Sequence, residues 1–336
     1  MASKRQEQVV ALSSLSVIEA LDASSYPRHR LHAEENLWVE KNCYIDVWIE
    51  ILHALRCDPL ALLPMVVAVE FEGDQWQFFK PPHKEISELY GLDVQELNVW
   101  RPLIEHVSEH LATGKLISTE ADAFWLPDTQ GTDYRRQHTK TTIVINELDV
   151  ERQKLGYFHN ASYYALEGED FERTFRLGQA PDPTFLPLFA ETVQTRHVVR
   201  RSGAELREMA RKNLRAHAAR RPSSNPIPRF AERIQRDLPL ITERGLPYYH
   251  AWAFATVRQA GAAFELLSQH LRWYEDPALE PAAVEFEKIG SGMKVLIMKG
   301  ARAVNGRRPL DTSALSEELS GAWASGMSTL ASALGV

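Results

Sequence analysis

The chain has 336 residues, of which 44% are hydrophobic and 25% are charged, the balance of a soluble globular protein. Its net charge of −7 argues against a dedicated nucleic-acid binder, because binding phosphates requires a surplus of basic residues. No window holds roughly 18 apolar residues in succession, and residues 1–7 lead into no apolar signal segment. We therefore expect a cytoplasmic protein without membrane contact, in which both cysteines are reduced.

A first helix is predicted to begin at Cys43. Apolar residues recur at helical spacing after it, and Asp58–Pro59 marks a stop. At a helix N-terminus, unpaired N–H groups and the positive end of the helix dipole favour a thiolate and can stabilise an oxyanion. The polar neighbours Asn42 and Asp46 also favour a reactive thiol. Cys57 lacks such neighbours, lies about four turns further along the helix, beyond disulfide reach, and is expected to be structural.

The next part of the chain predicts helices first and strands afterwards, which is an α+β order. Glycines at 73, 91 and 114 mark the expected turns and helix ends. The predicted elements are, in order, a β-hairpin formed by 65–71 and 75–79, a short helix over 83–91, a long amphipathic helix over 93–113, a strand over 115–125, a polar loop over 127–132, and strands over 138–145 and 153–158.

The remainder of the chain has helical periodicity almost throughout. The segment 248–273 is apolar on most sides, which predicts the central helix of a bundle. We expect an all-helical domain over 179–336 behind a papain-like domain over 1–178. The candidate helices are 185–195, 205–219, 229–241, 247–274, 282–305 and 313–334.

Three residues form the candidate catalytic set. A cysteine at a helix start and a histidine at the start of a later strand are the layout of papain-like nucleophilic catalysis, with Cys43 as nucleophile and His138 as base. Asn160, at the end of the strand after His138, is the candidate for orienting the imidazole. The alternatives stay open: cysteine is among the most buried residue types, and Asn160 or its neighbour His159 can equally be a satisfied turn residue.

Other polar residues are candidates for binding substrate. Glu120 and Asp122 share one face of the predicted strand by its period of two, and a pair of carboxylates can hold a cationic amine or simply form a solvated edge. Asn42, Tyr134 and His159 are included as further binding candidates. The sequence contains no C-x-x-C, H-E-x-x-H, P-loop or G-x-G-x-x-G pattern, so no metal site and no nucleotide chemistry are predicted.

Basic residues cluster between 196 and 221, where nine Lys or Arg accompany two Glu. A solvated helical face explains such a run. The alternative is a dock for an acidic partner such as a carrier protein or a phosphate-bearing arm.

Several longer motifs stand out within residues 35–175: Asn42-Cys43-Tyr44, Phe71-Glu72-Gly73-Asp74-Gln75-Trp76, Leu126-Pro127-Asp128-Thr129, His138-x-Lys140-Thr141-Thr142 and Gly156-Tyr157-Phe158-His159-Asn160. They resemble an uncharacterised bacterial family whose members are thought to accompany ligases that charge carrier proteins with amino acids. The order of elements, with Asp122-x-x-x-Leu126-Pro127 and Tyr134-x-x-x-His138, also resembles the N-terminal domain of the butirosin-biosynthesis aminoacyltransferase group, which is similar to papain.

The resemblance implies an acyltransferase without a bound cofactor. An aminoacyl group would pass from the phosphopantetheine thioester of an aminoacyl carrier protein to Cys43, and then to the amine or hydroxyl of a small-molecule or peptide acceptor. His138 would move the proton and Asn160 would orient it, although the butirosin-type relatives usually have Asp at the position of Asn160. A hydrolase using water as acceptor and a non-catalytic helical adaptor are the alternatives.

Overall fold

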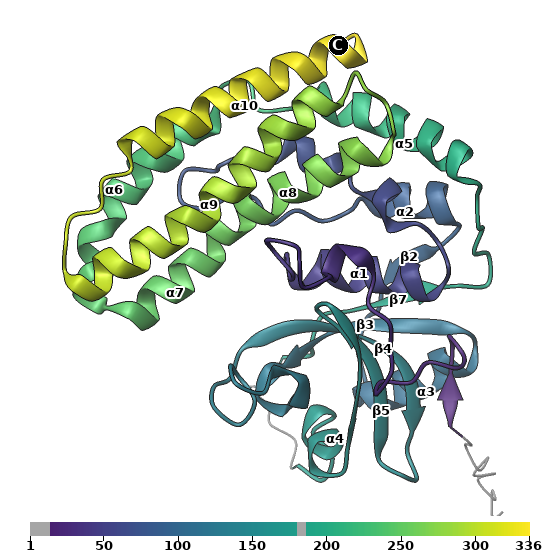
Figure 1. Cartoon of the computed structure of the whole chain (residues 1–336). Helices are drawn as coiled ribbons and strands as arrows, with labels where there is room; N and C mark the ends of the chain where they lie inside the picture. The colour runs from purple at the N-terminus through teal and green to yellow at the C-terminus, as the bar shows by residue number, and fades with distance from the viewer. Residues whose placement is uncertain (1–13, 180–185) are drawn as a thin grey trace, which may run out of the picture. The chain divides into compact units, whose positions relative to one another are not determined.

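The chain alternates between two units in the computed structural model (Figure 1). The structure describes residues 14–179 and 186–336. Unit 1 consists of Met1–Pro27 and Leu92–His197, and unit 2 of Arg28–Gly91 and Val198–Val336. The described residues mix helices with an antiparallel sheet, as expected for an α+β chain. The units interleave along the sequence, whereas the predicted division into 1–178 and 179–336 has a single boundary.

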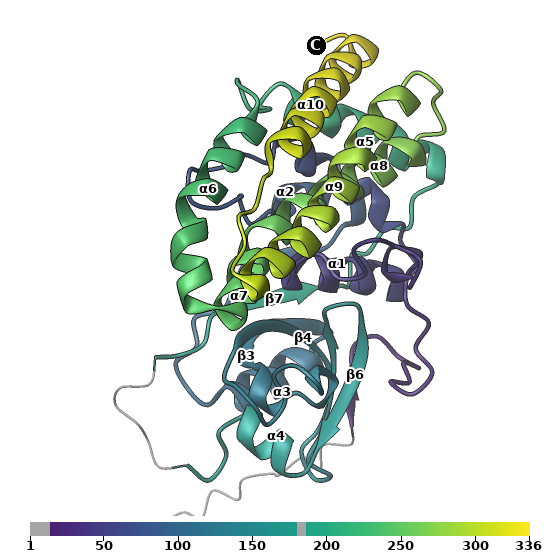
Figure 2. The same cartoon turned by 60° about the vertical axis from the view of Figure 1, so that its left-hand side comes forward.

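Unit 1 contains a seven-stranded sheet, counted over the described residues. Its order is β2-β7-β3-β4-β5-β6, with β1 beside β4, and every pair is antiparallel. Helix α3 packs against β3 and β4 (Figure 2), so its Val107 and Leu111 share a core with Ile117 and Ile145. The elements are β1 Leu15–Ser16, β2 Asp93–Glu96, α3 Leu103–Ala112, β3 Lys115–Asp122, β4 Lys140–Asp149, β5 Lys154–His159, β6 Ser162–Glu167, α4 Glu169–Thr174 and β7 Ala190–Gln194.

Two predicted helices of unit 1 are wrong. The long helix over 93–113 exists only from Leu103, because Pro102 disfavours helical backbone in the residue before it. The residues before that proline instead form β2, which pairs with β7. The helix predicted over 185–195 is wrong because Ala190–Gln194 is strand β7; residue 185 lies outside the described residues. Both errors concern the pairing of β2 with β7. These strands are separated by about 95 residues in the sequence, and local periodicity does not reveal such a pairing.

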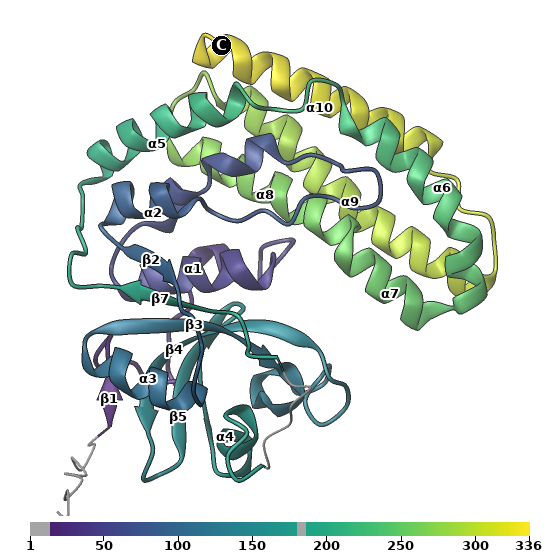
Figure 3. The ribbon, with the colours of Figure 1, turned by 180° about the vertical axis from the view of Figure 1, so that it is seen from behind.

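Unit 2 is built from helices, and α8 pairs with α9 along its length while α10 packs on α9 and α6 (Figure 3). Helix α8 is buried on most sides, which confirms the predicted central helix for the Val257–Trp273 part of the segment 248–273. The helices are α1 Cys43–Ala54, α2 His83–Tyr90, α5 Gly203–Ala218, α6 Pro226–Arg244, α7 Leu246–Ala255, α8 Val257–Trp273, α9 Glu280–Gly306 and α10 Ser313–Leu334, with short 3-10 turns η1 Arg30–His32, η2 Pro59–Leu62 and η3 Pro64–Ala68.

Two further predictions hold only in part in unit 2. The single helix over 247–274 is interrupted at Thr256, whose φ of −117° and ψ of −76° depart from regular helix values and whose hydroxyl donates to the Trp252 carbonyl at 2.7 Å. The hairpin predicted over 65–79 is confirmed only around its turn, where the Glu72 N–H donates to the Gln75 carbonyl at 2.9 Å and the Gln77 N–H donates to the Glu70 carbonyl at 3.0 Å. Its first strand is wrong, because Pro64–Ala68 is a 3-10 turn. Only Phe71 and Trp76 form a β-bridge there. Among the described residues, no helix has both the length and the apolar character needed to cross a membrane.

Gly261 of α8 is required by the Trp38 indole, which lies on its backbone while Trp38 Nε1 donates to the Gly290 carbonyl at 3.1 Å. A Cβ at position 261 would overlap this ring. We expect Gly261→Ala to destabilise the protein by about 1–3 kcal/mol in urea unfolding, because the ring must move. Gly321→Ala, where nothing lies within 4 Å of a new Cβ, is the matched control and should be neutral or stabilising. Equal effects of the two substitutions would contradict the overlap.

Candidate functional site

Cys43 is the first residue of α1, as predicted, and it is partly exposed. Asn42 caps this helix: its Oδ1 accepts from the backbone N–H groups of Tyr44 at 3.1 Å and Ile45 at 2.9 Å. Its Nδ2 donates to the Phe79 carbonyl at 3.1 Å, and the whole side chain is buried. The predicted role of Asn42 in substrate binding stays a prediction, beside the helix-capping role that the structure gives it.

The cap bears directly on the expected oxyanion site. The N–H groups of Tyr44 and Ile45 are already bound by Asn42, so they are not available to a substrate in this arrangement. Asp46, the other polar neighbour of Cys43, points into the interior and is fully buried. Polar residues beside Cys43 therefore have structural explanations, which sequence alone did not supply.

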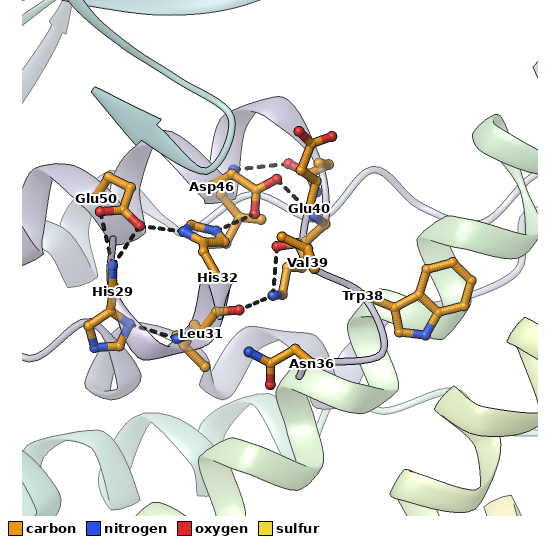
Figure 4. A network of polar contacts seen from close by, with 12 residues as sticks. His29, Leu31, His32, Asn36, Trp38, Val39, Glu40, Asp46 and Glu50 are labelled. Carbon is orange, nitrogen blue, oxygen red and sulfur yellow. Dashed lines mark hydrogen bonds and ion pairs between the residues drawn. The ribbon is translucent and has the colours of Figure 1, made fainter. Parts of the chain in front are cut away.

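Asp46 belongs to a buried charged network under α1 (Figure 4). His32 lies between two carboxylates of this helix, with Nε2 at 3.0 Å from Asp46 Oδ1 and Nδ1 against Glu50 Oε1. Asp46 Oδ2 accepts from the Lys41 backbone N–H at 2.8 Å, and Glu50 accepts from the His29 backbone N–H at 3.0 Å. The side chains of His32, Asp46 and Glu50 have no exposed surface. The network ties residues 29–41 to the helix that carries Cys43.

Both nitrogens of His32 are thus engaged by carboxylates. Burial opposes a charge on this ring, but the hydrogen bonds to Asp46 and Glu50 outweigh it and raise the pKa of His32. A ring held in this way has no nitrogen left to accept a proton from a thiol. His32 is accordingly a structural cation and not the base for Cys43.

His138 lies directly before β4, and its side chain is 69% exposed. Its Nδ1 is 2.6 Å from Asp122 Oδ2 at the end of β3. The ring stacks on Phe124, with centroids 4.4 Å apart and an interplanar angle of 13°. Phe124 also donates its backbone N–H to Asp122 Oδ1 at 3.1 Å. The other ring nitrogen, Nε2, makes no hydrogen bond within residues 14–179 and 186–336.

The remaining binding candidates in this unit are engaged in ion pairs and hydrogen bonds. Glu120 Oε1 accepts from Lys140 Nζ at 2.6 Å, so Glu120 and Asp122 bind separate partners across the β3–β4 pair. Tyr134 donates its hydroxyl to Asp170 Oδ2 at 2.8 Å. Their predicted roles in substrate binding stay predictions.

His159 and Asn160 occupy different settings. His159 is buried, with Nδ1 at 2.5 Å from Asp128 Oδ2 and Nε2 at 2.8 Å from Thr141 Oγ1. Asp128 Oδ1 also accepts from the Tyr157 hydroxyl at 2.5 Å, so this carboxylate anchors the segment before His138 to the sheet. Asp128 was missed as a site residue, although it lies in one of the conspicuous sequence motifs. Asn160 begins the two-residue turn between β5 and β6 and has a φ of 44°, a value typical of turn asparagines.

The predicted catalytic residues belong to both units. Cys43 is in unit 2, whereas His138 and Asn160 are in unit 1, so neither unit by itself contains a thiol–imidazole pair from this set. The partner that the structure gives His138 is Asp122. Cys57 is buried, as expected, and burial raises the pKa of its thiol. No group of three or more metal-ligating side chains is present among the described residues.

The basic segment between 196 and 221 is partly neutralised inside unit 2. Arg201 pairs with Glu205, Arg211 Nη2 lies 2.8 Å from Asp276 Oδ2, and Arg215 donates to the Leu334 carbonyl at 3.2 Å. These contacts explain several of its charges without a partner molecule. Docking of an acidic partner stays a prediction.

Two family models match the chain. The DUF1839 N-terminal domain matches residues 27–195, and the DUF1839 C-terminal domain matches residues 203–332. The chain belongs to the DUF1839 family. This family is one of unknown function, which confirms the coarse part of the resemblance. A search of curated proteins gives no match. The two models of this DUF1839 protein meet between residues 195 and 203, while the predicted domain boundary near 178 stays a prediction.

Proposed function

We propose that this DUF1839 protein is a cysteine-dependent aminoacyltransferase with a papain-like catalytic domain. The observation that supports it best is the partly exposed Cys43 at the first position of a capped helix, where the dipole favours negative charge. A second support is the His138 imidazole, exposed and held by a carboxylate at Nδ1.

In the proposed reaction the Cys43 thiolate attacks the carbonyl of an aminoacyl phosphopantetheine thioester on a carrier protein. The new bond is a thioester to Cys43, and the bond to the pantetheine sulfur breaks as that sulfur takes a proton from His138. An acceptor amine or hydroxyl then attacks the acyl-enzyme and gives its proton to His138. The amide or ester leaves, and the Cys43 thiolate is restored.

The test is intact-mass spectrometry after mixing the full-length protein with an aminoacyl pantetheine thioester. We expect one aminoacyl adduct, lost in Cys43→Ala and kept in Cys57→Ala, which is the matched control because burial raises the pKa of the Cys57 thiol. His138→Gln should slow adduct formation about 10²-fold or more, because it removes the imidazole that gives a proton to the leaving pantetheine sulfur. An unchanged adduct in Cys43→Ala would refute the proposal.

Acceptor dependence separates transfer from hydrolysis. Beyond the first equivalent that acylates Cys43, a transferase should consume thioester only when an amine or hydroxyl acceptor is present, whereas a hydrolase consumes it with water alone. If no acceptor accelerates turnover, the result would support a hydrolase instead of a transferase.

A non-catalytic adaptor is the second candidate, and one observation favours it. Asn42 already binds the N–H groups of Tyr44 and Ile45, which are the donors expected to stabilise an oxyanion. Alkylation by iodoacetamide at neutral pH distinguishes the two. If the protein is an enzyme, iodoacetamide should alkylate Cys43 well before Cys57. Equal alkylation rates of the two thiols would support the adaptor.

A further inference from the structure

Asp122 is the last residue of β3. The β3–β4 register places it opposite Lys140, which follows His138 by two positions in the sequence. Its two carboxylate oxygens have different partners. Oδ1 accepts from the Phe124 backbone N–H at 3.1 Å, and Oδ2 lies 2.6 Å from His138 Nδ1. The first contact fixes the orientation of the carboxylate, so the second oxygen points to the imidazole.

An ionised carboxylate only accepts hydrogen bonds, so His138 Nδ1 must carry the hydrogen. In the neutral ring Nε2 is then the nitrogen with the free lone pair. The Phe124 ring, stacked at 4.4 Å, restricts rotation of the imidazole. Together these contacts hold a ring whose basic nitrogen has no partner among the described residues.

We propose that Asp122 is the positioning residue of His138, in the role that the sequence suggested for Asn160. This inference rests on the proposed function for its catalytic meaning, but its geometry lies within unit 1. Asn160 instead begins the β5–β6 turn, and Glu120, two residues before Asp122 on the same strand, pairs with Lys140. Asp122 thus acts on the tautomer and direction of the imidazole and touches no reacting atom itself.

The substitution Asp122→Asn gives a specific expectation. The asparagine Oδ1 must keep the hydrogen bond from the Phe124 N–H, which leaves the NH₂ group in the position of Oδ2. That group donates to His138 Nδ1, so the hydrogen of the neutral ring moves to Nε2. The lone pair then faces the introduced amide and is lost as a base. Because the Asp122 side chain is 37% exposed and asparagine has the same shape, the variant should fold.

The test is a long-range ¹H–¹⁵N spectrum of the histidine rings in full-length protein, at a pH where they are neutral. The His138 signal is assigned by its loss in His138→Gln. We expect the Nδ1–H form in wild type, in Glu120→Gln and in Asn160→Gly, and the Nε2–H form in Asp122→Asn. The charged pair Glu120 and Lys140 on the same two strands is unchanged in Asp122→Asn. Glycine retains the positive φ of position 160.

Two outcomes would overturn the assignment: a wild-type tautomer in Asp122→Asn, or the Nε2–H form in Asn160→Gly. Adduct formation at Cys43 provides the second readout, and we expect Asp122→Asn to slow it about 10²-fold or more. If no variant forms an adduct, the proposed function fails, while the ring spectra still decide whether Asp122 sets the tautomer.

Discussion

Replacing His32 with leucine should destabilise unit 2 by about 3–5 kcal/mol, because it leaves two buried carboxylates without their shared cation. Asp46 and Glu50 have no exposed surface, and the backbone N–H groups of Lys41 and His29 that remain bound to them carry no charge. The measurement is urea unfolding followed by tryptophan fluorescence. Six of the eight tryptophans belong to unit 2, so the signal reports mainly on that unit.

The control is the double variant His32→Leu/Glu50→Gln. A glutamine is neutral and still accepts from the His29 backbone N–H, so it should recover part of the lost stability. A His32→Leu variant that loses less than about 1 kcal/mol would show that the carboxylates find other partners.

The network also predicts how the free energy of unfolding depends on pH. The sign of the His32 contribution is opposite to that of a histidine whose pKa burial lowers. The pKa of His32 is raised in the folded protein, so its contribution is fully present below the unfolded value of about 6.5. It is lost as the pH rises through the folded pKa. The stability difference between wild type and His32→Leu should therefore shrink toward alkaline pH. The titratable groups that act on the ring are Asp46 and Glu50, which bind it, and the charges of Lys41 and His29.

A second large effect is expected on acidification, from His270 of α8. This ring is completely buried, and burial lowers its pKa to about 3. Between about 6.5 and 3 the unfolded chain binds a proton that the folded chain does not, so stability falls as the pH falls. One such group costs at most about 1.4 kcal/mol for each pH unit in this range. His29, whose pKa burial also lowers to about 3, acts in the same direction.

The variant His270→Asn tests this expectation, because an amide can still donate to the Leu60 carbonyl, which lies 2.8 Å from His270 Nδ1. Its free energy of unfolding should depend less steeply on pH between about 6.5 and 4 than that of wild type, measured by urea titration at several pH values. The exposed His250→Asn is the control and should keep the wild-type slope. Identical slopes in all three proteins would contradict the assignment of acid sensitivity to His270.

Local signals were sufficient to predict several helices. Cys43–Ala54 follows an asparagine cap, His83–Tyr90 ends at Gly91 with a φ of 70°, and Ser313–Leu334 coincides with the predicted range. Strands β3, β4 and β5 were also recognised, because each consists of neighbouring residues with strand-like character. In all these elements the information lies within the element or beside it.

Pairing over long sequence distances was not predictable. Strand β2 has a helical pattern of apolar residues but exists as a strand because it pairs with β7. The Asp122–His138 contact has the same origin, since the β3–β4 register brings together residues that are 16 positions apart. Asn160 was predicted as the partner of His138 because it ends the strand after the histidine and carries an amide, but a residue of this kind is equally typical of a hairpin turn. The burial of Asp46 and the cap formed by Asn42 likewise depend on tertiary packing.

The interleaved path of the chain affects how the protein is made. The turns η2 and η3 of unit 2 pack against α5 and α8, which are translated more than a hundred residues later. At roughly 5–20 residues per second, residues 28–91 wait on the order of 10–40 s for α8 to be synthesised. Apolar side chains such as Leu60, Leu63 and Val66 stay uncovered for that time. Nascent chains stalled between the two halves of unit 2 should consequently recruit chaperones that bind exposed hydrophobic segments.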